Sequence, residues 1–102
     1  MIRGTTPTFT LDVEGIDLTD KKIVVTLEQD ETELDIQNPR CAESERGCTI
    51  TFDLSQEQTL MFRSGRASIQ VRWINEEGSA GATDVATFSV GKVLKEGEVN
   101  YE

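Results

Sequence analysis

Apolar and polar residues alternate with a period of two along most of the chain, which is the pattern of half-buried β-strands. No run has the period of an amphipathic helix. The alternation predicts strands over residues 6–13, 21–29, 32–37, 48–54, 67–74 and 84–90. The side chains expected to face the core are Phe9, Leu11, Val13, Ile23, Val25, Leu27, Leu34, Ile36, Cys48, Ile50, Phe52, Leu54, Ala67, Ile69, Val71, Trp73, Ala86, Phe88 and Val90.

One short helical turn is expected in the corner LSQEQTLMF. Ser55 and Gln58 have the S-x-x-Q spacing of a capping box, which starts a helix by satisfying its first backbone donors. The turn is too short to be stable without tertiary packing, and Leu60 and Phe62 are expected to anchor it to the core. Gly65 then allows the chain to reverse. A helical turn between two strands suits a crossover from one sheet of a sandwich to the other.

These features predict an all-β protein: an immunoglobulin-like antiparallel β-sandwich of about six to seven strands, with one short helical turn near residues 55–61. A length of 102 residues fits one domain, residues 1–102. Residues 92–102 are less regular. Val93, Leu94 and Val99 have little core left to bury them, so this tail is expected either to add an edge strand or to act as a docking arm.

Charge limits the classes of partner. The chain has 19 acidic and 10 basic residues, with a net charge of −9. Nucleic-acid binding depends on basic residues that neutralise phosphates, so neither nucleic acid nor an anionic membrane is an expected partner. No apolar run approaches the roughly 18 residues of a membrane span. The start, MIRGTTPTFT, lacks the apolar region of a secretory signal, so the chain is expected in the cytoplasm at synthesis.

Catalytic chemistry has little support in the residue types. The chain has no histidine, which removes the usual general base and the commonest zinc ligand. Glu31, Glu33 and Asp35 alternate with apolar residues, and carboxylates on a solvent face keep ordinary pKa values. We therefore expect no enzyme activity, no catalytic residue and no cofactor.

Calcium binding is a better functional interpretation of the acidic residues than catalysis, because calcium takes six to eight oxygen ligands. The segment DVEGIDLTD offers Asp12, Glu14, Asp17 and Asp20 in a bend between strands. Their spacing does not match the EF-hand loop, so a solvated loop without metal is the favoured interpretation.

Two cysteines and one tryptophan have alternative interpretations. Cys41 and Cys48 would form a disulfide in a secreted protein, whereas free thiols are the default in the cytoplasm. The segment that they bracket, residues 38–48, has no assigned role. Trp73 would be a platform for a sugar ring if it were exposed, but its phase with Ile69 and Val71 places it in the core.

Four segments together resemble a family: MIRGTTPTFTL, LSQEQTLMF, GRASIQVRW and SVGKVLKEGEV. They are similar to small proteins encoded in prophage tail and baseplate regions of Gram-positive bacteria. The N-terminal domains of phage baseplate upper proteins look similar in size and β-sandwich character. The resemblance covers both ends and the middle and implies a complete chain, although the segment 38–48 lies outside it.

The resemblance implies a non-enzymatic structural protein of a tail or baseplate. Its partners would be other copies of itself or neighbouring virion proteins, and Val93, Leu94 and Val99 are the candidate interaction residues. Its location would be the host cytoplasm before assembly and the virion afterwards. The alternative is a ligand-binding or adhesion module that holds a carbohydrate or uses calcium.

Overall fold

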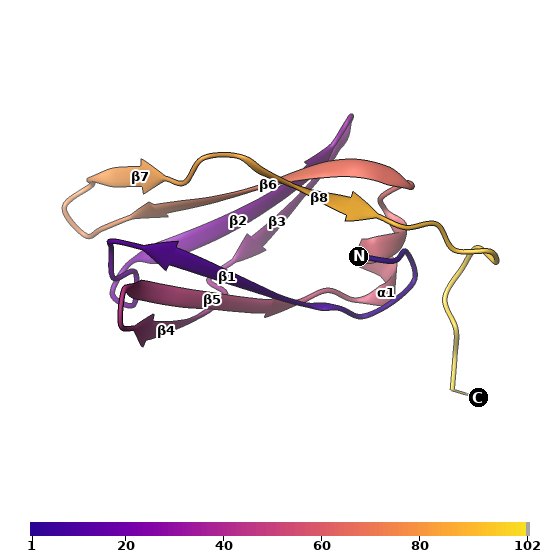
Figure 1. The fold of residues 1–102 in the computed structure, drawn as a ribbon, viewed down its shortest axis with the longest axis horizontal. Coiled ribbons are helices and arrows are strands. Elements are labelled where there is room, and N and C mark those ends of the chain that lie inside the picture. Colours follow the sequence, from indigo (N-terminus) through magenta and orange to yellow (C-terminus); the bar gives the residue numbers. More distant parts are fainter. Residues whose placement is uncertain (102) are drawn as a thin grey trace.

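Two antiparallel β-sheets pack face to face in the computed structural model, which describes residues 1–101 (Figure 1). The predicted all-β sandwich with one short helix is confirmed. The elements are β1 Thr8–Glu14, β2 Lys22–Gln29, β3 Thr32–Gln37, β4 Arg40–Ser44, β5 Gly47–Asp53, α1 Gln56–Leu60, β6 Gly65–Ile74, β7 Ala80–Ala82 and β8 Ala86–Val90.

The smaller sheet has the strand order β1-β5-β4, and the larger one has β3-β2-β6 followed by a divided edge. β7 pairs with one end of β6 and β8 with the other, so two short strands share one edge. Eight strands are present where about six to seven were expected, because β7 shares this edge with β8 and β4 adds a third strand to the small sheet. The order matches strands B-E-D and C′-C-F-G of an immunoglobulin sandwich. Within residues 1–101, no strand occupies the position of strand A beside β1.

The core lies between the sheets and consists mainly of the side chains expected there. Its most buried strand residues come from β2, β5 and β6, the central strands, because these are covered on both sides. Phe9, Leu11, Leu34 and Ile36 are half-buried, since β1 and β3 are edge strands. Ala86 was predicted to face the core and is exposed, so the apolar face of β8 begins only at Phe88.

Two of the strands, β4 and β7, were not predicted from the sequence. β4 lies in the unassigned segment 38–48 and forms a hairpin with β5. Only Cys41 of its five residues is even half-buried, so no alternation marks it. β7 has the sequence Ala-Gly-Ala, which carries no apolar signal, yet it pairs with β6 because Gly81 leaves room for the Trp73 ring.

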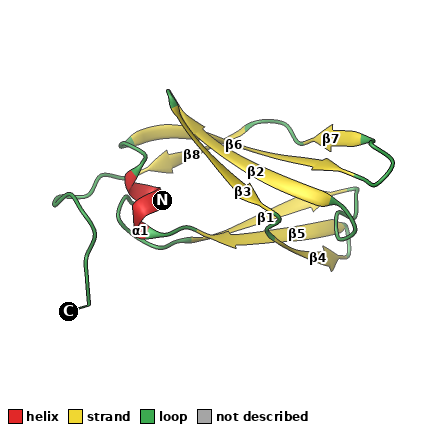
Figure 2. Cartoon of the chain, turned by 180° about the vertical axis from the view of Figure 1, so that it is seen from behind, coloured by secondary structure: helices red, strands yellow, loops and turns green. Residues whose placement is uncertain are grey.

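The predicted capping box is present. The Gln58 amide donates to Ser55 Oγ at 3.1 Å, and the Ser55 amide donates to Gln58 Oε1 at 2.9 Å. The helix α1 connects β5 in the small sheet to β6 in the large one (Figure 2). Phe62, just after α1, is buried in the core, and Leu60 is half-buried.

Candidate functional site

Three segments that are far apart in the sequence meet at the α1 end of the sandwich. They are the N-terminal residues 1–5, the helix α1, and the tail 91–101 that leaves β8 (Figure 1). The Gly91 amide donates to Met1 O at 2.7 Å, and the Arg3 amide donates to Gly91 O at 3.1 Å. The N-terminus therefore lies alongside the start of the tail as a short parallel bridge.

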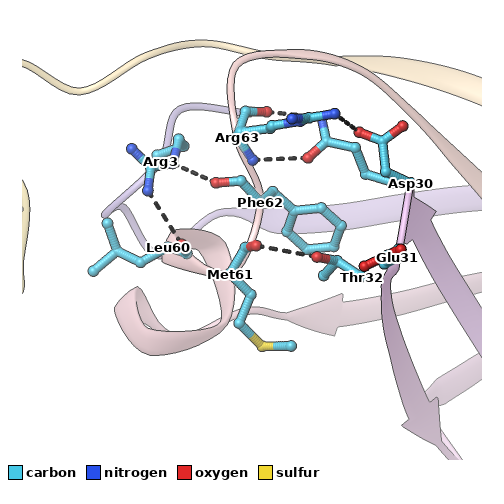
Figure 3. Close-up of a pocket in the computed structure, with 9 residues that line it drawn as sticks. Arg3, Asp30, Glu31, Thr32, Leu60, Met61, Phe62 and Arg63 are labelled. Atoms are coloured by element: carbon cyan, nitrogen blue, oxygen red, sulfur yellow. Dashed lines mark hydrogen bonds and ion pairs between the residues drawn. The ribbon is translucent and has the colours of Figure 1, made fainter.

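Arg3 connects all three segments. Its guanidinium donates to the carbonyl oxygens of Leu60, at 3.2 Å, and Phe62 (Figure 3). The same group forms a two-pronged ion pair with Glu96 of the tail. The hydrogen bond from Arg3 lowers the pKa of Glu96 below its ordinary value. Because helix carbonyls at a C-terminus lack intrahelical donors, Arg3 also satisfies the end of α1.

Thr59 is fully buried and joins α1 to the N-terminal segment. Its hydroxyl accepts from the Gly4 amide at 2.9 Å and donates to Thr5 O at 2.9 Å. Thr59 was not among the residues predicted to have a role. A buried threonine in a capped helical turn has no distinctive pattern, so only the partners reveal its role.

The side-chain amide of Gln56 holds the backbone of the tail at Val99. Its side-chain nitrogen donates to Val99 O at 3.0 Å, and its oxygen accepts from the Val99 amide at 2.7 Å. The amide group thus imitates the backbone of a neighbouring strand. The tail is therefore attached to the domain at two places, through Glu96 and through Val99.

The apolar side chains of the tail point largely into solvent. Leu94 is 96% exposed and Val99 is 78% exposed, and Tyr101 is completely exposed. Of the three predicted interaction residues, only Val93 is half-buried, near Gly4 and the helix. Residues 92–101 form no strand, so the structure has an arm and not an edge strand. Residue 102 of the predicted arm lies outside the described residues.

An open hollow of about 560 Å³ lies between the β2–β3 turn and the segment after α1 (Figure 3). Its polar groups are occupied by the fold itself. The Gln29 side chain exchanges two hydrogen bonds of 2.7 Å with the backbone of Arg63, whose guanidinium forms an ion pair with Asp30. In residues 1–101, no buried side-chain nitrogen or oxygen lacks a partner. The hollow is thus a polar surface whose buried hydrogen-bonding side chains already have partners within the fold.

The predicted solvent face of β3 is confirmed. Glu33 and Asp35 are exposed, as is Glu31 in the preceding turn. Asp35 accepts a hydrogen bond of 2.7 Å from Thr26 on β2, so it serves the sheet.

The four acidic residues considered for calcium do not converge. Asp12 and Glu14 are exposed on β1, whereas Asp17 accepts from the Thr19 amide at 2.9 Å and thereby closes a local turn. That hydrogen bond lowers the pKa of Asp17. Asp20 forms an ion pair with the adjacent lysine at 3.0 Å. Within the described part of the chain, no group of three or more metal-ligating residues gathers in one place.

Cys41 and Cys48 are free thiols on neighbouring strands, and both face the core side of the small sheet. Burial, with a hydrogen bond to Cys48, raises the pKa of Cys41 to about 11. Since the thiolate is the reactive form, this thiol is a poor nucleophile at neutral pH. Trp73 is half-buried and packs against the core, with its ring over Gly81.

Comparison of the chain with protein-family models, with curated proteins and with solved structures gave no match. No helix among residues 1–101 is long and apolar enough to cross a membrane.

Proposed function

We propose that the chain is a non-enzymatic structural protein that acts through protein–protein contacts of its C-terminal arm, residues 92–102. The observation that carries this proposal is a contrast within the arm. The arm is held against the domain through the carboxylate of Glu96 and the backbone of Val99, yet the side chains of Leu94, Val99 and Tyr101 are exposed.

Physical chemistry favours a protein partner for such an arm. Burying an exposed leucine or valine side chain yields about 1.5–3 kcal/mol, and binding loses part of this gain whenever a mobile segment must become ordered. An arm that is already attached avoids part of that entropic cost. The partner in this proposal is another copy of the chain or a neighbouring protein of the same assembly.

The assembly in this proposal is a phage or prophage tail or baseplate. Its support is the resemblance of four segments, at the two ends and in the middle of the chain, to small proteins encoded in prophage tail and baseplate regions. The acidic surface agrees with it, because a net charge of −9 limits nonspecific association where copies are concentrated. The chain would then lie in the host cytoplasm before assembly and in the virion afterwards.

The test compares a double variant, Leu94→Ser with Val99→Ser, with the control Val85→Ser. Val85, the residue before β8, is 60% exposed. It lies on the outer face of the large sheet, away from the arm. Size-exclusion chromatography with light scattering is run on each variant, alone and mixed with proteins encoded by neighbouring genes. The double variant should stay folded and lose association, while the control keeps it.

Deletion of residues 92–102 is the second arm of the test. Circular dichroism should show that the shortened chain keeps its β spectrum, because Leu94, Val99 and Tyr101 contribute little to the core. If the deletion unfolds the domain, the tail is part of the fold and not a docking arm. If the intact chain stays monomeric and binds no neighbouring protein, the proposed function is wrong.

A further inference from the structure

The two sheets have four edges within residues 1–101, and three of them are protected against pairing with another chain. The edge formed by β7 and β8 is interrupted at residues 83–85, and residues 1–3 cover its end. β4 has only five residues and carries Glu43 opposite Cys48, so a charge lies on its core-side face. Short strands, interruptions and inward charges are the usual defences of an edge.

The third protected edge, β3, is defended by its own charges. In a two-fold antiparallel pair of β3 strands, opposite residues must lie on the same face of the sheet. The central registers pair Glu33 with Glu33, Glu33 with Asp35, or Asp35 with Asp35 of the second copy. Each of them places two acidic residues opposite each other. Like charges that face each other across strands are destabilising. Self-association through β3 is therefore disfavoured.

β1 is the edge without these defences. It is seven residues long, unbroken, free of lysine and proline, and has no charge on its core-side face. It corresponds to strand B of an immunoglobulin sandwich, beside which strand A would lie, and it pairs only with β5 in the described chain. Phe9 and Leu11 on it are half-buried, so apolar surface remains at this edge.

The hydrogen bonds at the two ends of β1 show which of its backbone groups are open. The Leu54 amide donates to Pro7 O at 3.1 Å, and the Gly15 amide donates to Arg46 O at 2.6 Å. In an antiparallel pair, every second residue exchanges bonds with its partner. The backbone amides and carbonyls of the odd-numbered residues of β1 therefore point toward β5. The open groups belong to the even-numbered residues, which are Thr8, Thr10, Asp12 and Glu14.

The sequence of β1, TFTLDVE, is complementary to itself in one register. With a two-fold axis at Leu11, Thr8 faces Glu14 of the second copy, and Thr10 faces Asp12 of the second copy. Both of these pairs join open residues, as backbone pairing requires. No two acidic residues face each other. Leu11 meets its own copy in a non-hydrogen-bonded pair, where side chains approach most closely.

The fold already uses the pair chemistry that this register creates. Threonine lies directly opposite aspartate at three places, and each threonine hydroxyl donates to the aspartate across from it. The three pairs are Thr8–Asp53 at 2.6 Å, Thr26–Asp35 at 2.7 Å and Thr49–Asp12 at 3.0 Å.

We propose that β1 is a homodimerisation edge, at which β1 strands of two copies pair antiparallel about a two-fold axis at Leu11. The three strands of each small sheet then form one continuous sheet across the dimer. This partner is a second copy of the same chain. The pairing uses a different surface from the arm and does not depend on the proposed function.

The dimer is expected to be weak and salt-dependent. A single pair of edge strands buries less surface than the roughly 1,200 Å² at the lower limit of standard interfaces. Each copy also carries a net charge of −9, and salt screens the repulsion between copies over the Debye length. Sedimentation equilibrium should show a reversible monomer–dimer equilibrium that shifts toward dimer as salt is added. A chain that remains monomeric at millimolar concentration in high salt would overturn the proposal.

Opposite charge changes at one exposed position test the register. Thr10→Asp places an acid opposite Asp12 of the second copy, whereas Thr10→Lys places a base there. Because each change occurs twice per dimer, Thr10→Asp should weaken the dimer about tenfold and Thr10→Lys should strengthen it. Thr87→Asp and Thr87→Lys, at an exposed position of β8, make the same changes in net charge. Equal effects at the two positions would show that only net charge matters and would refute the β1 register.

Disulfide trapping gives a test that does not depend on affinity. In a Cys41→Ser, Cys48→Ala background, Leu11→Cys places two thiols at the axis, with Cα atoms about 4.5 Å apart, within disulfide range. Thr8→Cys places them about 20 Å apart, since six residues separate position 8 from its partner. Oxidised glutathione should link the first variant and not the second. Equal linking of both would refute the register.

The two proposals fail separately. Deletion of residues 92–102 should leave the β1 dimer intact, and Thr10→Asp should leave association through the arm intact. Loss of the β1 dimer on removal of the arm would assign self-association to the arm and overturn the inference about β1.

Discussion

The Gln29 side chain offers a sharp test of how the loop after α1 is held. It is buried at the end of β2, and its amide exchanges two hydrogen bonds of 2.7 Å with the Arg63 backbone. Gln29→Leu keeps the volume of the side chain but leaves the amide and carbonyl of Arg63 without partners. An unsatisfied buried group costs about 1–3 kcal/mol. Both groups are only partly buried, so the free energy of unfolding should fall by about 2–3 kcal/mol in all.

Gln29→Glu adds a dependence on pH. A protonated carboxyl group still donates to Arg63 O and accepts from the Arg63 amide, whereas a carboxylate has no donor. Burial and the facing carbonyl therefore raise the pKa of this carboxyl group above its ordinary value of about 4.3. A raised pKa in the folded state means that stability is fully present below the unfolded-state pKa and is lost as pH rises through the folded-state pKa. The variant should be near wild type at pH 4 and destabilised at pH 7.

Urea unfolding followed by tryptophan fluorescence measures both effects. With a slope of about 1–3 kcal/mol per molar urea, a loss of about 2–3 kcal/mol lowers the midpoint by roughly 0.7–3 M. Gln37→Leu and Gln37→Glu are matched controls, because Gln37 is exposed on β3. A cost of Gln29→Leu no larger than that of Gln37→Leu, or equal stability of Gln29→Glu at both pH values, would contradict this role of the Gln29 side chain.

Three other parts of the structure can be tested by substitution or by pH. Ile69→Ala removes a core side chain and should lower the free energy of unfolding by about 2–5 kcal/mol in denaturant titrations. Gly81→Ala places a Cβ atom 2.7 Å from the Trp73 ring, so the ring must move; a shifted tryptophan emission and a loss of about 1–3 kcal/mol are expected. The lowered pKa of Glu96 means that its ion pair with Arg3 stabilises the folded chain above the unfolded-state pKa and is lost as pH falls through the folded-state pKa. Heteronuclear relaxation should show the arm becoming mobile in acid, and Glu96→Gln should make it mobile at neutral pH.

Local pattern was sufficient for much of the sandwich. The alternation in residues 32–37 predicted β3 to the residue, and the S-x-x-Q spacing predicted the capping box at Ser55. Alternation also placed Val25, Ile50 and Val71 in the core. These features are readable because each depends on residues that are two to four positions apart.

The candidate site was predicted only in outline. The residue types of Val93, Leu94 and Val99 indicated that the tail lacks a core to join, and Leu94 and Val99 are indeed exposed. The partners that hold the tail, Arg3 and Gln56, lie more than forty positions away along the chain. No local pattern marks a polar side chain whose partner is so distant.

By itself, the sequence determined which stretches form two-sided strands and which of their faces is apolar, because side-chain alternation is built into the extended backbone. Tertiary structure alone decided which strands pair. Pairing with β5 and β6 makes β4 and β7 strands, although neither has an apolar pattern of its own. It also decided that β1 is an open edge, since an edge is defined by a neighbour that is missing. Outside the β2–β3 and β4–β5 hairpins, pairings such as β1 with β5 and β2 with β6 join residues about 30 to 50 positions apart, so their pattern exists only once the sheets have formed.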